Sequence, residues 1–415
     1  MLAVAVIGAG YRGATHLETV ARLHDRYRLV GVCDAREERR DWARARYAAP
    51  VFDHPLALLD GVRPDVVSIA VPPDAHHLLT AAAAARGCHV LSETPISTTL
   101  AMADAMAAAC RRAGVVLEVA ENVWRFPQER LKRLAVDAGL IGAVQQVHVW
   151  YRSGSYHGTN ALRRFLPGRP LRALGVTRPF RVTPYRDLEG QERRTQTWEL
   201  GVIEFPAGET AVYQWPVGSD RGNLWEVVGD AGVISGADLV LFDGPDGARR
   251  RIPPQPVSEP DAAGQPILAA LRYDPGDGRP AAVWENPYRR YGLSAADDVA
   301  RADVFAGLAA RVAGGTSVGD AKGAEGDWPA APPAGADFYG APNARADQEL
   351  LMAIRESARR GSAWIDLPLP VGRQTAFEAQ LHEEFEARYG APPFSDPEAL
   401  LGRLFPRRGL EQTVH

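Results

Sequence analysis

Lysine is almost absent from this chain, and cysteine is scarce. The only lysines are Lys132 and Lys322, so nearly all of the 47 basic residues are arginines. The three cysteines, Cys33, Cys88 and Cys110, form an odd set without the spacing of a metal site. We therefore expect reduced thiols in a cytoplasmic protein, with neither a disulfide framework nor a bound metal ion.

Long apolar runs and an excess of positive charge are missing as well. No uninterrupted apolar stretch reaches the roughly 20 residues that a membrane helix needs. The apolar start at Leu2 has no basic segment before it and runs into a glycine turn, so we expect no export signal. The formal net charge of −4 gives no reason to expect nucleic acid or an anionic membrane as a partner.

Residues 1–121 alternate short, valine-rich apolar runs with helix-like segments. We expect strands at residues 2–7, 29–33, 66–71, 89–91 and 115–119, and helices at 14–23, 75–86 and 100–112. Ser97 is predicted to cap the last of these helices, and Gly114 to end it. Strands of this kind are buried on both faces, and repeated βα units imply a parallel sheet. The pattern predicts an α/β Rossmann domain, which is a doubly wound nucleotide-binding fold.

A G-x-G-x-x-G turn joins the first expected strand to the first helix. Its glycines are Gly8, Gly10 and Gly13, with Tyr11 and Arg12 between the last two. Glycines at these places allow a tight turn, close approach of a pyrophosphate, and close packing of the helix on the strand. The positive end of the helix then faces the phosphates. We therefore predict a bound dinucleotide here rather than a turn that serves the fold alone.

The preference between NAD and NADP depends on the end of the second expected strand, where Asp34 lies. A carboxylate at this place accepts hydrogen bonds from the ribose hydroxyls and repels a 2′-phosphate, which favours NAD. Arg36 is close enough in sequence to neutralise such a phosphate. NAD is the prediction, and NADP is not excluded.

Residues 122–415 follow a different pattern, which predicts an α+β domain for substrate binding and oligomerisation. After a helix at 127–138, strand-like segments follow without helices between them, at 144–151, 198–205, 210–215, 225–228 and 239–242. This order predicts one open, mostly antiparallel sheet. A stretch dense in glycine, alanine and proline predicts a loop-like excursion at about 314–340, before a helix at 348–359.

Four segments carry a resemblance to the glucose–fructose oxidoreductase/inositol dehydrogenase (Gfo/Idh/MocA) family. They are residues 71–76 (V-P-P-D-A-H), 93–95 (E-T-P), 121–126 (E-N-V-W-R-F) and 157–160 (H-G-T-N). They are similar to the family's T-P-N-x-x-H loop, its E-K-P turn, its N-x-R-[FY] stretch, and the segment that begins with its catalytic histidine. The resemblance implies hydride transfer between NAD and a carbon of a sugar, cyclitol or modified-sugar alcohol.

The glycine turn and this resemblance together give the residues expected at the cofactor. They are Gly8, Gly10, Tyr11, Arg12, Gly13, Asp34, Val71, Pro72, His76, Glu93 and Asn122.

The expected catalytic group is His157, which the resemblance aligns with the family's catalytic histidine. Its ordinary pKa near 6.5 suits a base at neutral pH, although a capping or packed histidine is the competing interpretation. Thr94 stands where the family carries its lysine, while Ser153 and Asn160 stand where it carries acids. Threonine supplies no charge to a substrate hydroxyl, and a positioned acid or base is worth about 10² to 10⁴ in rate. Tyr156 and Thr94 complete the expected catalytic set.

The residues expected to bind substrate lie in the segments around His157. If a helix begins near Gly158, Asn160 and Arg164 share one of its faces; a solvated pair of arginines at 163 and 164 is the competing interpretation. An aromatic ring and a guanidinium in the 121–126 segment suit a sugar ring, although they also suit an ordinary helix entry. The expected substrate set is Trp124, Arg125, Tyr151, Asn160 and Arg164.

Three functions compete. The first is an NAD-dependent oxidoreductase with His157 as acid and base, and it is favoured because it needs the fewest assumptions. The second is a redox-neutral lyase, epimerase or glycosidase that holds NAD tightly and returns the hydride to the same carbon. The third is a nucleotide-binding sensor without catalysis. The resemblance also implies a homodimer or homotetramer formed through the sheet of the C-terminal domain.

Overall fold

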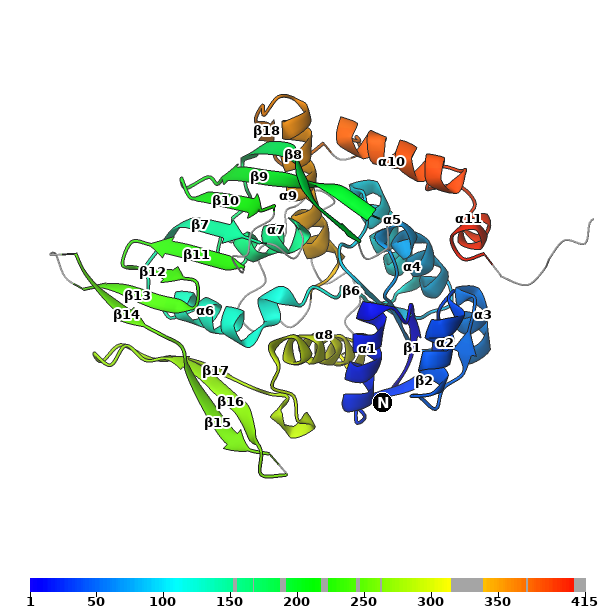
Figure 1. Cartoon of the computed structure of the whole chain (residues 1–415), viewed down its shortest axis with the longest axis horizontal. Helices are drawn as coiled ribbons and strands as arrows, with labels where there is room; N and C mark the ends of the chain where they lie inside the picture. Colours follow the sequence, from blue (N-terminus) through cyan, green and yellow to red (C-terminus); the bar gives the residue numbers. More distant parts are fainter. Residues whose placement is uncertain are drawn as a thin grey trace, which may run out of the picture.

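The computed structural model describes residues 1–151, 155–166, 168–186, 192–217, 223–243, 247–261, 263–314, 339–370 and 372–406. Its N-terminal part is a six-stranded parallel sheet, sheet A, with the strand order β3-β2-β1-β4-β5-β6 (Figure 1). The strands are β1 (Leu2–Ile7), β2 (Tyr27–Cys33), β3 (Val51–Phe52), β4 (Val66–Ile69), β5 (His89–Ser92) and β6 (Leu117–Val119). The predicted Rossmann fold is confirmed, with β3 too short to show a periodicity.

The helices that accompany sheet A follow its strands along the chain. They are α1 (Tyr11–Arg22), α2 (Glu37–Arg44), α3 (Pro55–Val62), the 3₁₀ turn η1 (Pro73–Ala75), α4 (His76–Ala84) and α5 (Leu100–Ala113). The predicted cap of α5 is wrong, because the Thr99 hydroxyl accepts from the Met102 amide while Ser97 donates to the Thr99 carbonyl. Gly114 ends α5 as predicted, at a φ of +67° that suits glycine.

The C-terminal part contains a larger sheet, sheet B, with the order β14-β13-β12-β11-β7-β10-β9-β8-β18. Its pairings are antiparallel except for β10 with β7, so the mostly antiparallel sheet is confirmed. The strands are β7 (Val144–Trp150), β8 (Arg172–Arg186), β9 (Glu192–Glu204), β10 (Thr210–Trp215), β11 (Leu224–Gly229), β12 (Gly232–Ser235), β13 (Asp238–Asp243), β14 (Ala248–Ile252) and β18 (Ile365–Asp366).

A second, three-stranded sheet corrects the prediction of one sheet. Sheet C consists of β15 (Gln255–Pro260), β16 (Pro266–Tyr273) and β17 (Ala282–Glu285), in the order β15-β16-β17. In Figure 1 it projects away from sheet A on the side of β14. The expected excursion at 314–340 lies outside the described residues except at its ends.

Helices join the two parts of the molecule. The remaining ones are η2 (Val123–Arg125), α6 (Pro127–Asp137), α7 (Ser155–Arg163), η3 (Arg289–Tyr291), α8 (Ala296–Ala313), α9 (Ala341–Arg359), α10 (Ala376–Tyr389) and α11 (Pro397–Leu404). α7 and α9 pack on sheet B, while α8 contacts α1 and α11 contacts α4 (Figure 1). One hydrophobic cluster contains Val4 of sheet A, Val147 of sheet B and Phe305 of α8. The two sheets therefore share a continuous core.

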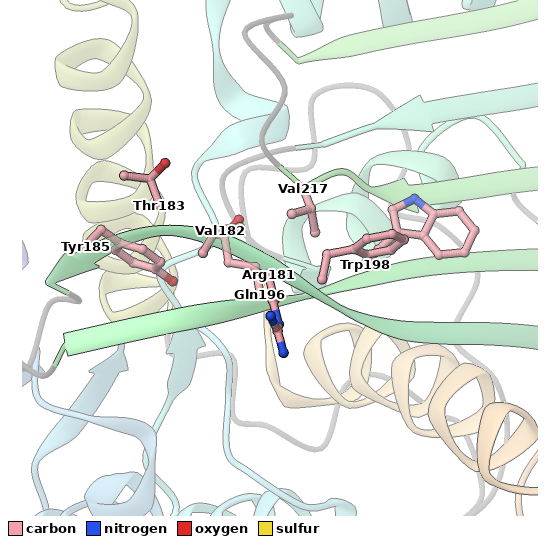
Figure 2. A pocket seen from close by; sticks show the side chains of 8 residues that line it. Arg181, Val182, Thr183, Tyr185, Gln196, Trp198 and Val217 are labelled. Carbon is pink, nitrogen blue, oxygen red and sulfur yellow. The ribbon is translucent and has the colours of Figure 1, made fainter.

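The hairpin of β8 and β9 extends beyond the body of sheet B. β9 pairs with β10 only from Glu199 to Glu204, whereas its pairing with β8 continues out to Glu192. The outer half of β8 is exposed, and Figure 2 shows the pocket along this ribbon. It is lined by Phe180, Arg181, Val182, Thr183, Tyr185, Gln196, Trp198 and Val217.

Candidate functional site

The glycine turn after β1 has the shape that a pyrophosphate requires. Gly8 has a φ of +95°, and a Cβ there would lie 2.2 Å from the Ala70 carbonyl oxygen. A Cβ on Gly13 would lie 1.8 Å from the Gly8 carbonyl oxygen, so the start of α1 packs directly on the turn. Around Gly10 the nearest atom that a Cβ would meet is Arg36 Nη2, at 3.4 Å. Two glycines thus serve the fold, and the third leaves room beside the N-terminus of α1, which fits a dinucleotide.

Asp34, at the end of β2, holds this turn in place. Its carboxylate accepts from the Ala9 amide at 2.7 Å and from the Arg36 amide at 2.9 Å. The Arg36 guanidinium lies 3.5 Å from the same carboxylate. A carboxylate offers about four acceptor positions, so these contacts leave capacity for ribose hydroxyls. The carboxylate fits NAD.

The loop after β4 is fixed by His76. Its ring is fully buried, with Nε2 2.9 Å from the Val71 carbonyl and Nδ1 3.1 and 3.2 Å from the Pro95 and Ile96 carbonyls. Burial lowers the pKa of His76 below its usual value, although the hydrogen bonds with these carbonyls act to raise it. The side chain therefore ties the 71–76 loop to the 93–96 turn. These contacts fit a role in positioning Val71, and the cofactor role predicted for His76 stays a prediction.

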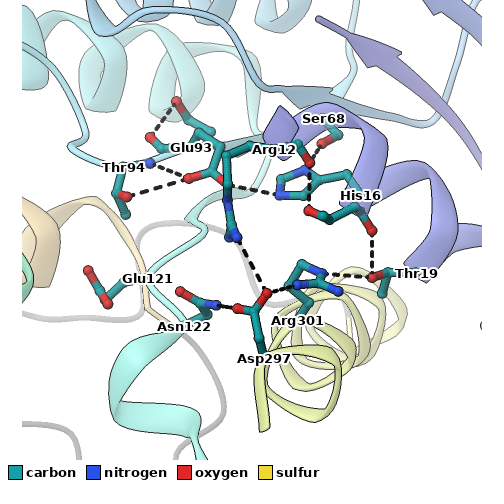
Figure 3. Close-up of polar contacts among 12 residues, drawn as sticks. Arg12, His16, Thr19, Ser68, Glu93, Thr94, Glu121, Asn122, Asp297 and Arg301 are labelled. Carbon is teal, nitrogen blue, oxygen red and sulfur yellow. Dashed lines mark hydrogen bonds and ion pairs between the residues drawn. The ribbon is translucent and has the colours of Figure 1, made fainter. Parts of the chain in front are cut away.

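Glu93, in the E-T-P turn, is the centre of a buried network that Figure 3 shows. It accepts from Arg12 Nε at 2.8 Å, from His16 Nε2 at 3.0 Å, and from the Thr94 amide at 2.9 Å. The His16 Nδ1 meets the Ser68 hydroxyl at 2.8 Å. Burial works to raise the pKa of Glu93, but His16 and Arg12 outweigh it and hold that pKa well below its usual value. Glu93 is thus an ionised anchor for Arg12 and Thr94.

Asp297 brings α8 into the same network. Its carboxylate accepts from Asn122 Nδ2 at 2.5 Å, bonds Arg301, and lies 3.7 Å from Arg12 Nη1 (Figure 3). Asn122 follows β6 and Arg12 begins α1. Asp297 therefore adds a carboxylate from the C-terminal part, and it contacts two of the residues predicted at the cofactor, Asn122 and Arg12.

His157 and Glu121 form a close pair in the candidate site. The His157 Nδ1 lies 2.7 Å from Glu121 Oε2, and Glu121 is completely buried while His157 is 19% exposed. A carboxylate only accepts, so Nδ1 donates and Nε2 is the nitrogen left to take a proton. Burial works to lower the pKa of His157, but the Glu121 carboxylate outweighs it and the pKa stands above its usual value.

The two tyrosines predicted beside His157 differ in their surroundings. The Tyr156 hydroxyl lies 3.0 Å from the Tyr339 hydroxyl, and burial raises its pKa well above the usual value. Tyr156 is therefore a neutral, engaged phenol, which suits support of α7 better than the predicted proton transfer. The Tyr151 ring lies 5.8 Å from the His157 ring and packs against it.

Arg125 belongs to the frame of the site rather than to its binding surface. It is 1% exposed, with Nη2 2.8 Å from Glu118 and Nη1 3.0 Å from Asp303. These ion pairs account for both terminal nitrogens, which speaks against the substrate role predicted for it. Trp124 stands beside it, and the guanidinium groups of Arg125 and Arg130 lie 4.6 and 4.4 Å from the Trp124 ring.

The helix α7 turns its other expected residues toward α9. Asn160 donates to Asp347 at 2.6 Å, and Arg163 pairs with Asp347 at 2.5 Å. Arg163 and Arg164 are 4% and 7% exposed, so the interpretation of a solvated pair is wrong. The Asn160 Nδ2 is thus engaged by Asp347, while its Oδ1 is buried without a hydrogen-bond partner among the described residues. The Arg164 guanidinium lies 3.9 Å from the Trp124 ring.

Lys132, the lysine within the described residues, does not replace the one that the family carries. Lys132 is buried on α6, where Nζ pairs with Glu129 at 2.8 Å and lies 5.1 Å from the Trp225 ring. Lys322 and Ser153 lie outside the described residues. In the part of the chain that the structure describes, no cluster of His, Cys, Asp and Glu could hold a metal ion. No helix in those residues is long and apolar enough to cross a membrane.

Three contributors to the site went unrecognised in the sequence. Glu121 lies inside the 121–126 segment, and an acid two residues after β6 was the signal that could have revealed it. Asp297 and Tyr339 belong to the C-terminal part, 175 and 183 residues away from Asn122 and Tyr156, their respective partners. A pattern of neighbouring residues in the sequence cannot predict contacts between residues so far apart along the chain.

Comparison with known proteins agrees with an NAD-binding domain at the N-terminus. Residues 2–121 match a family model described as "Oxidoreductase family, NAD-binding Rossmann fold". The chain is 38% identical over 118 residues to a D-glucoside 3-dehydrogenase of Escherichia coli K12, which covers 28% of this chain and 33% of that protein. It is 29% identical over 250 residues to inositol 2-dehydrogenase 1 of Saccharopolyspora erythraea, which covers 56% and 73%.

The likeness in fold extends further than the likeness in sequence. A levoglucosan dehydrogenase, solved with NADH and levoglucosan, superposes with a TM-score of 0.64 at 18% identity. That match covers 89% of this chain and all of the other. In sequence, the chain spans only 33% to 46% of the length of the first three curated relatives it matches.

Proposed function

We propose that the chain is an NAD-dependent dehydrogenase of a sugar, cyclitol or modified-sugar alcohol within the Gfo/Idh/MocA oxidoreductase family. Its residues 2–121 match the NAD-binding Rossmann domain of that family. The single observation that carries the proposal is the buried Glu121 beside His157, at 2.7 Å. A carboxylate held against one ring nitrogen fixes the tautomer that a general base needs.

In the proposed reaction the residues of this chain handle the proton. His157 Nε2 takes the proton from the hydroxyl of the reacting carbon, so that the C–O bond becomes a carbonyl as the C–H bond breaks. The positive charge that then develops on the imidazole is stabilised by Glu121, which faces its other nitrogen. NAD, when bound, supplies the acceptor for the hydride and its electron pair.

Thr94 makes the site differ from the pattern of the family. Thr94 carries no positive charge. The nearest guanidinium named at this turn is that of Arg12, whose Nε lies 2.8 Å from the carboxylate of Glu93, the residue before Thr94. Besides Glu121, the negative charge of Glu93 raises the pKa of His157 and the positive charge of Arg12 lowers it. We propose that the Glu121–His157 pair carries the proton transfer without a lysine, and that Thr94 shapes the turn beside the substrate.

The test begins with the purified, untreated protein. We expect little retained nucleotide, reversible uptake of NAD in preference to NADP, and NADH formation, followed by absorbance, with members of a panel of sugars and cyclitols. Mass spectrometry after denaturation identifies any retained nucleotide. NAD held near one per chain without net NADH formation would favour the redox-neutral lyase, epimerase or glycosidase, and failure to bind either nucleotide would contradict the whole proposal.

A matched variant separates cofactor binding from folding. In Gly10→Ala the new Cβ meets only Arg36 Nη2, at 3.4 Å, so the ligand-free fold should survive. The same Cβ would occupy the room predicted for the pyrophosphate. Loss of NAD binding at an unchanged thermal midpoint is therefore the expected control result.

We also propose a homodimer or homotetramer formed through sheet B. Support comes from the outer part of the β8–β9 hairpin, where Phe180 and Tyr185 are 48% and 39% exposed. A two-stranded ribbon is marginally stable on its own and gains from a partner. Light scattering should give a mass of at least twice 44.9 kDa, and a particle of 44.9 kDa would contradict the proposal.

A further inference from the structure

Arg164 holds a buried positive charge directly after α7. Its side chain is 7% exposed. The guanidinium carbon lies 3.9 Å from the Trp124 ring and 5.3 Å from the Tyr339 ring, so two aromatic side chains enclose it. Such stacking leaves the edge of the guanidinium, where its N–H groups lie, for hydrogen bonds.

The neighbouring arginines have anionic partners. Arg125 and Arg130 pair with Asp303, at 3.0 and 2.6 Å, and Arg125 also pairs with Glu118. Arg163, the residue before Arg164, pairs with Asp347 at 2.5 Å. Each of these cations thus meets at least one carboxylate.

Arg164 differs from them. Among the residues that the structure describes, its side chain forms no ion pair, and its Nη2 is buried without any hydrogen-bond partner. The Trp124 Nε1 is also buried without a partner. Two buried donors on stacked side chains therefore have no acceptor within the described chain.

An arrangement of this kind is costly unless a ligand completes it. Buried charges in proteins are paired as a rule, and a buried donor without a partner loses the hydrogen bond it had in water. Burial lowers the pKa of Arg164 to about 9, and the group still carries its charge at neutral pH. A negative group that arrives with a ligand would meet a donor already fixed in place.

The place of Arg164 in the fold connects it to the proposed reaction. The segment from Glu121 to Trp124 binds His157 at one end and stacks on Arg164 at the other. Three residues span at most about 11 Å even when fully extended, and here the segment includes the compact turn η2. The distance between the two ends is therefore within the length of a sugar-sized ligand.

We propose that Arg164, with Trp124 Nε1 beside it, binds a carboxylate of the substrate, which makes the substrate a polyhydroxylated acid of the uronate or aldonate class. The inference rests on the proposed function and narrows its substrate. A carboxylate suits the site better than a phosphate because Arg164 offers one unmatched positive charge among the residues that the structure describes. The nearby carboxylates of Asp347, Asp303 and Glu118 would repel a second negative charge.

Calorimetry on the NAD-loaded protein tests this with two pairs of probes, D-glucose with D-glucuronate and D-glucitol with D-gluconate. In at least one pair the acid should bind about 10- to 100-fold more tightly than its neutral partner, as expected for a hydrogen-bonded charge. Arg164→Gln should remove this preference and leave the neutral affinity within about twofold. Arg164→Lys, which keeps the charge, should retain part of it.

Arg345→Gln serves as the matched control. Arg345 lies on α9 and pairs with Asp104, at 2.5 Å, so its loss should leave the preference intact. Thermal unfolding gives a second readout, since Arg164→Gln breaks no ion pair and should not lower the midpoint of the ligand-free protein.

Two results would overturn the assignment. One is equal binding of acid and neutral probe in both pairs, and the other is an equal loss of both probes together with a lower midpoint in Arg164→Gln. The proposed function is judged separately. NADH formation from neutral polyols without an acid preference would remove only this inference, whereas an acid preference without NADH formation would remove only the proposed function.

Discussion

A His157→Ala variant should turn over at least about 100-fold more slowly than the unchanged chain, with nearly the same affinity for NAD. The Nδ1 nitrogen is occupied by Glu121 at 2.7 Å, so Nε2 is the atom available to take the substrate proton. Alanine removes this acceptor and leaves Gly10 and the start of α1 untouched. Steady-state kinetics at saturating NAD and substrate, with calorimetry for NAD, measure the two quantities.

His24→Ala is a suitable control, because His24 is exposed and its Nδ1 contacts only the Arg22 carbonyl among the described atoms. It should change neither turnover nor NAD affinity. A structural role of His157 would instead lower the thermal midpoint, and activity would fall in proportion to the folded fraction. Such a parallel loss would contradict the assignment of His157 as the base.

A Glu121→Gln variant should lose activity and change its pH profile in a defined direction. A base accepts a proton only when neutral, so activity rises as pH passes upward through the pKa of His157. Glu121 raises that pKa against the effect of burial. Without the carboxylate burial prevails, and the rising limb of the profile should move to lower pH.

The plateau of the same profile should fall by about tenfold or more. A neutral amide no longer stabilises the imidazolium that forms on proton transfer, and it no longer enforces one tautomer. Rates measured across the pH range at saturating substrate separate the shift of the limb from the drop of the plateau. An unchanged limb would show that Glu121 does not act on His157.

Glu356→Gln is the matched control for this experiment. Glu356 is also a buried carboxylate, 1% exposed, but it lies on α9 and pairs with Arg360 at 2.7 Å. Its loss should cost some stability and leave the pH profile where it is. Equal shifts in both variants would show a general effect of removing a buried charge.

The N-terminal part shows how far local sequence patterns reach. β1 was predicted at its observed bounds, Leu2–Ile7, and the glycine turn was placed between β1 and α1. A buried parallel strand is a continuous apolar run, and a glycine turn is a local steric requirement. Both features depend only on residues that are neighbours in the sequence, so both could be predicted from it.

The long strand β8, at Arg172–Arg186, shows where such patterns stop. It contains Pro179 and Pro184 and is exposed along its outer half, so it lacks the alternation of a half-buried strand. Proline is tolerated on strands with a free edge, and β18 pairs with β8 only at Arg172 and Ala173. Its position in sheet B, not its composition, makes it a strand.

Helix α8 was missed for the opposite reason. Its buried residues run without interruption from Val299 to Leu308, because sheet A's helix α1 and the C-terminal part enclose it. A helix covered on all sides shows no one-sided apolar stripe. The surroundings that bury it exist only in the folded molecule.

The sequence by itself determined the dinucleotide fold, the glycine turn, the acid at Asp34 and the position of His157. The tertiary structure decided which charges meet, and so which candidates remain free for a ligand. Arg125 and Arg164 look alike in the sequence, yet Arg125 is held by two carboxylates and Arg164 by none among the described residues. Steric and apolar requirements act between neighbours along the chain, whereas a charge is balanced by whichever group the fold brings within a few ångströms.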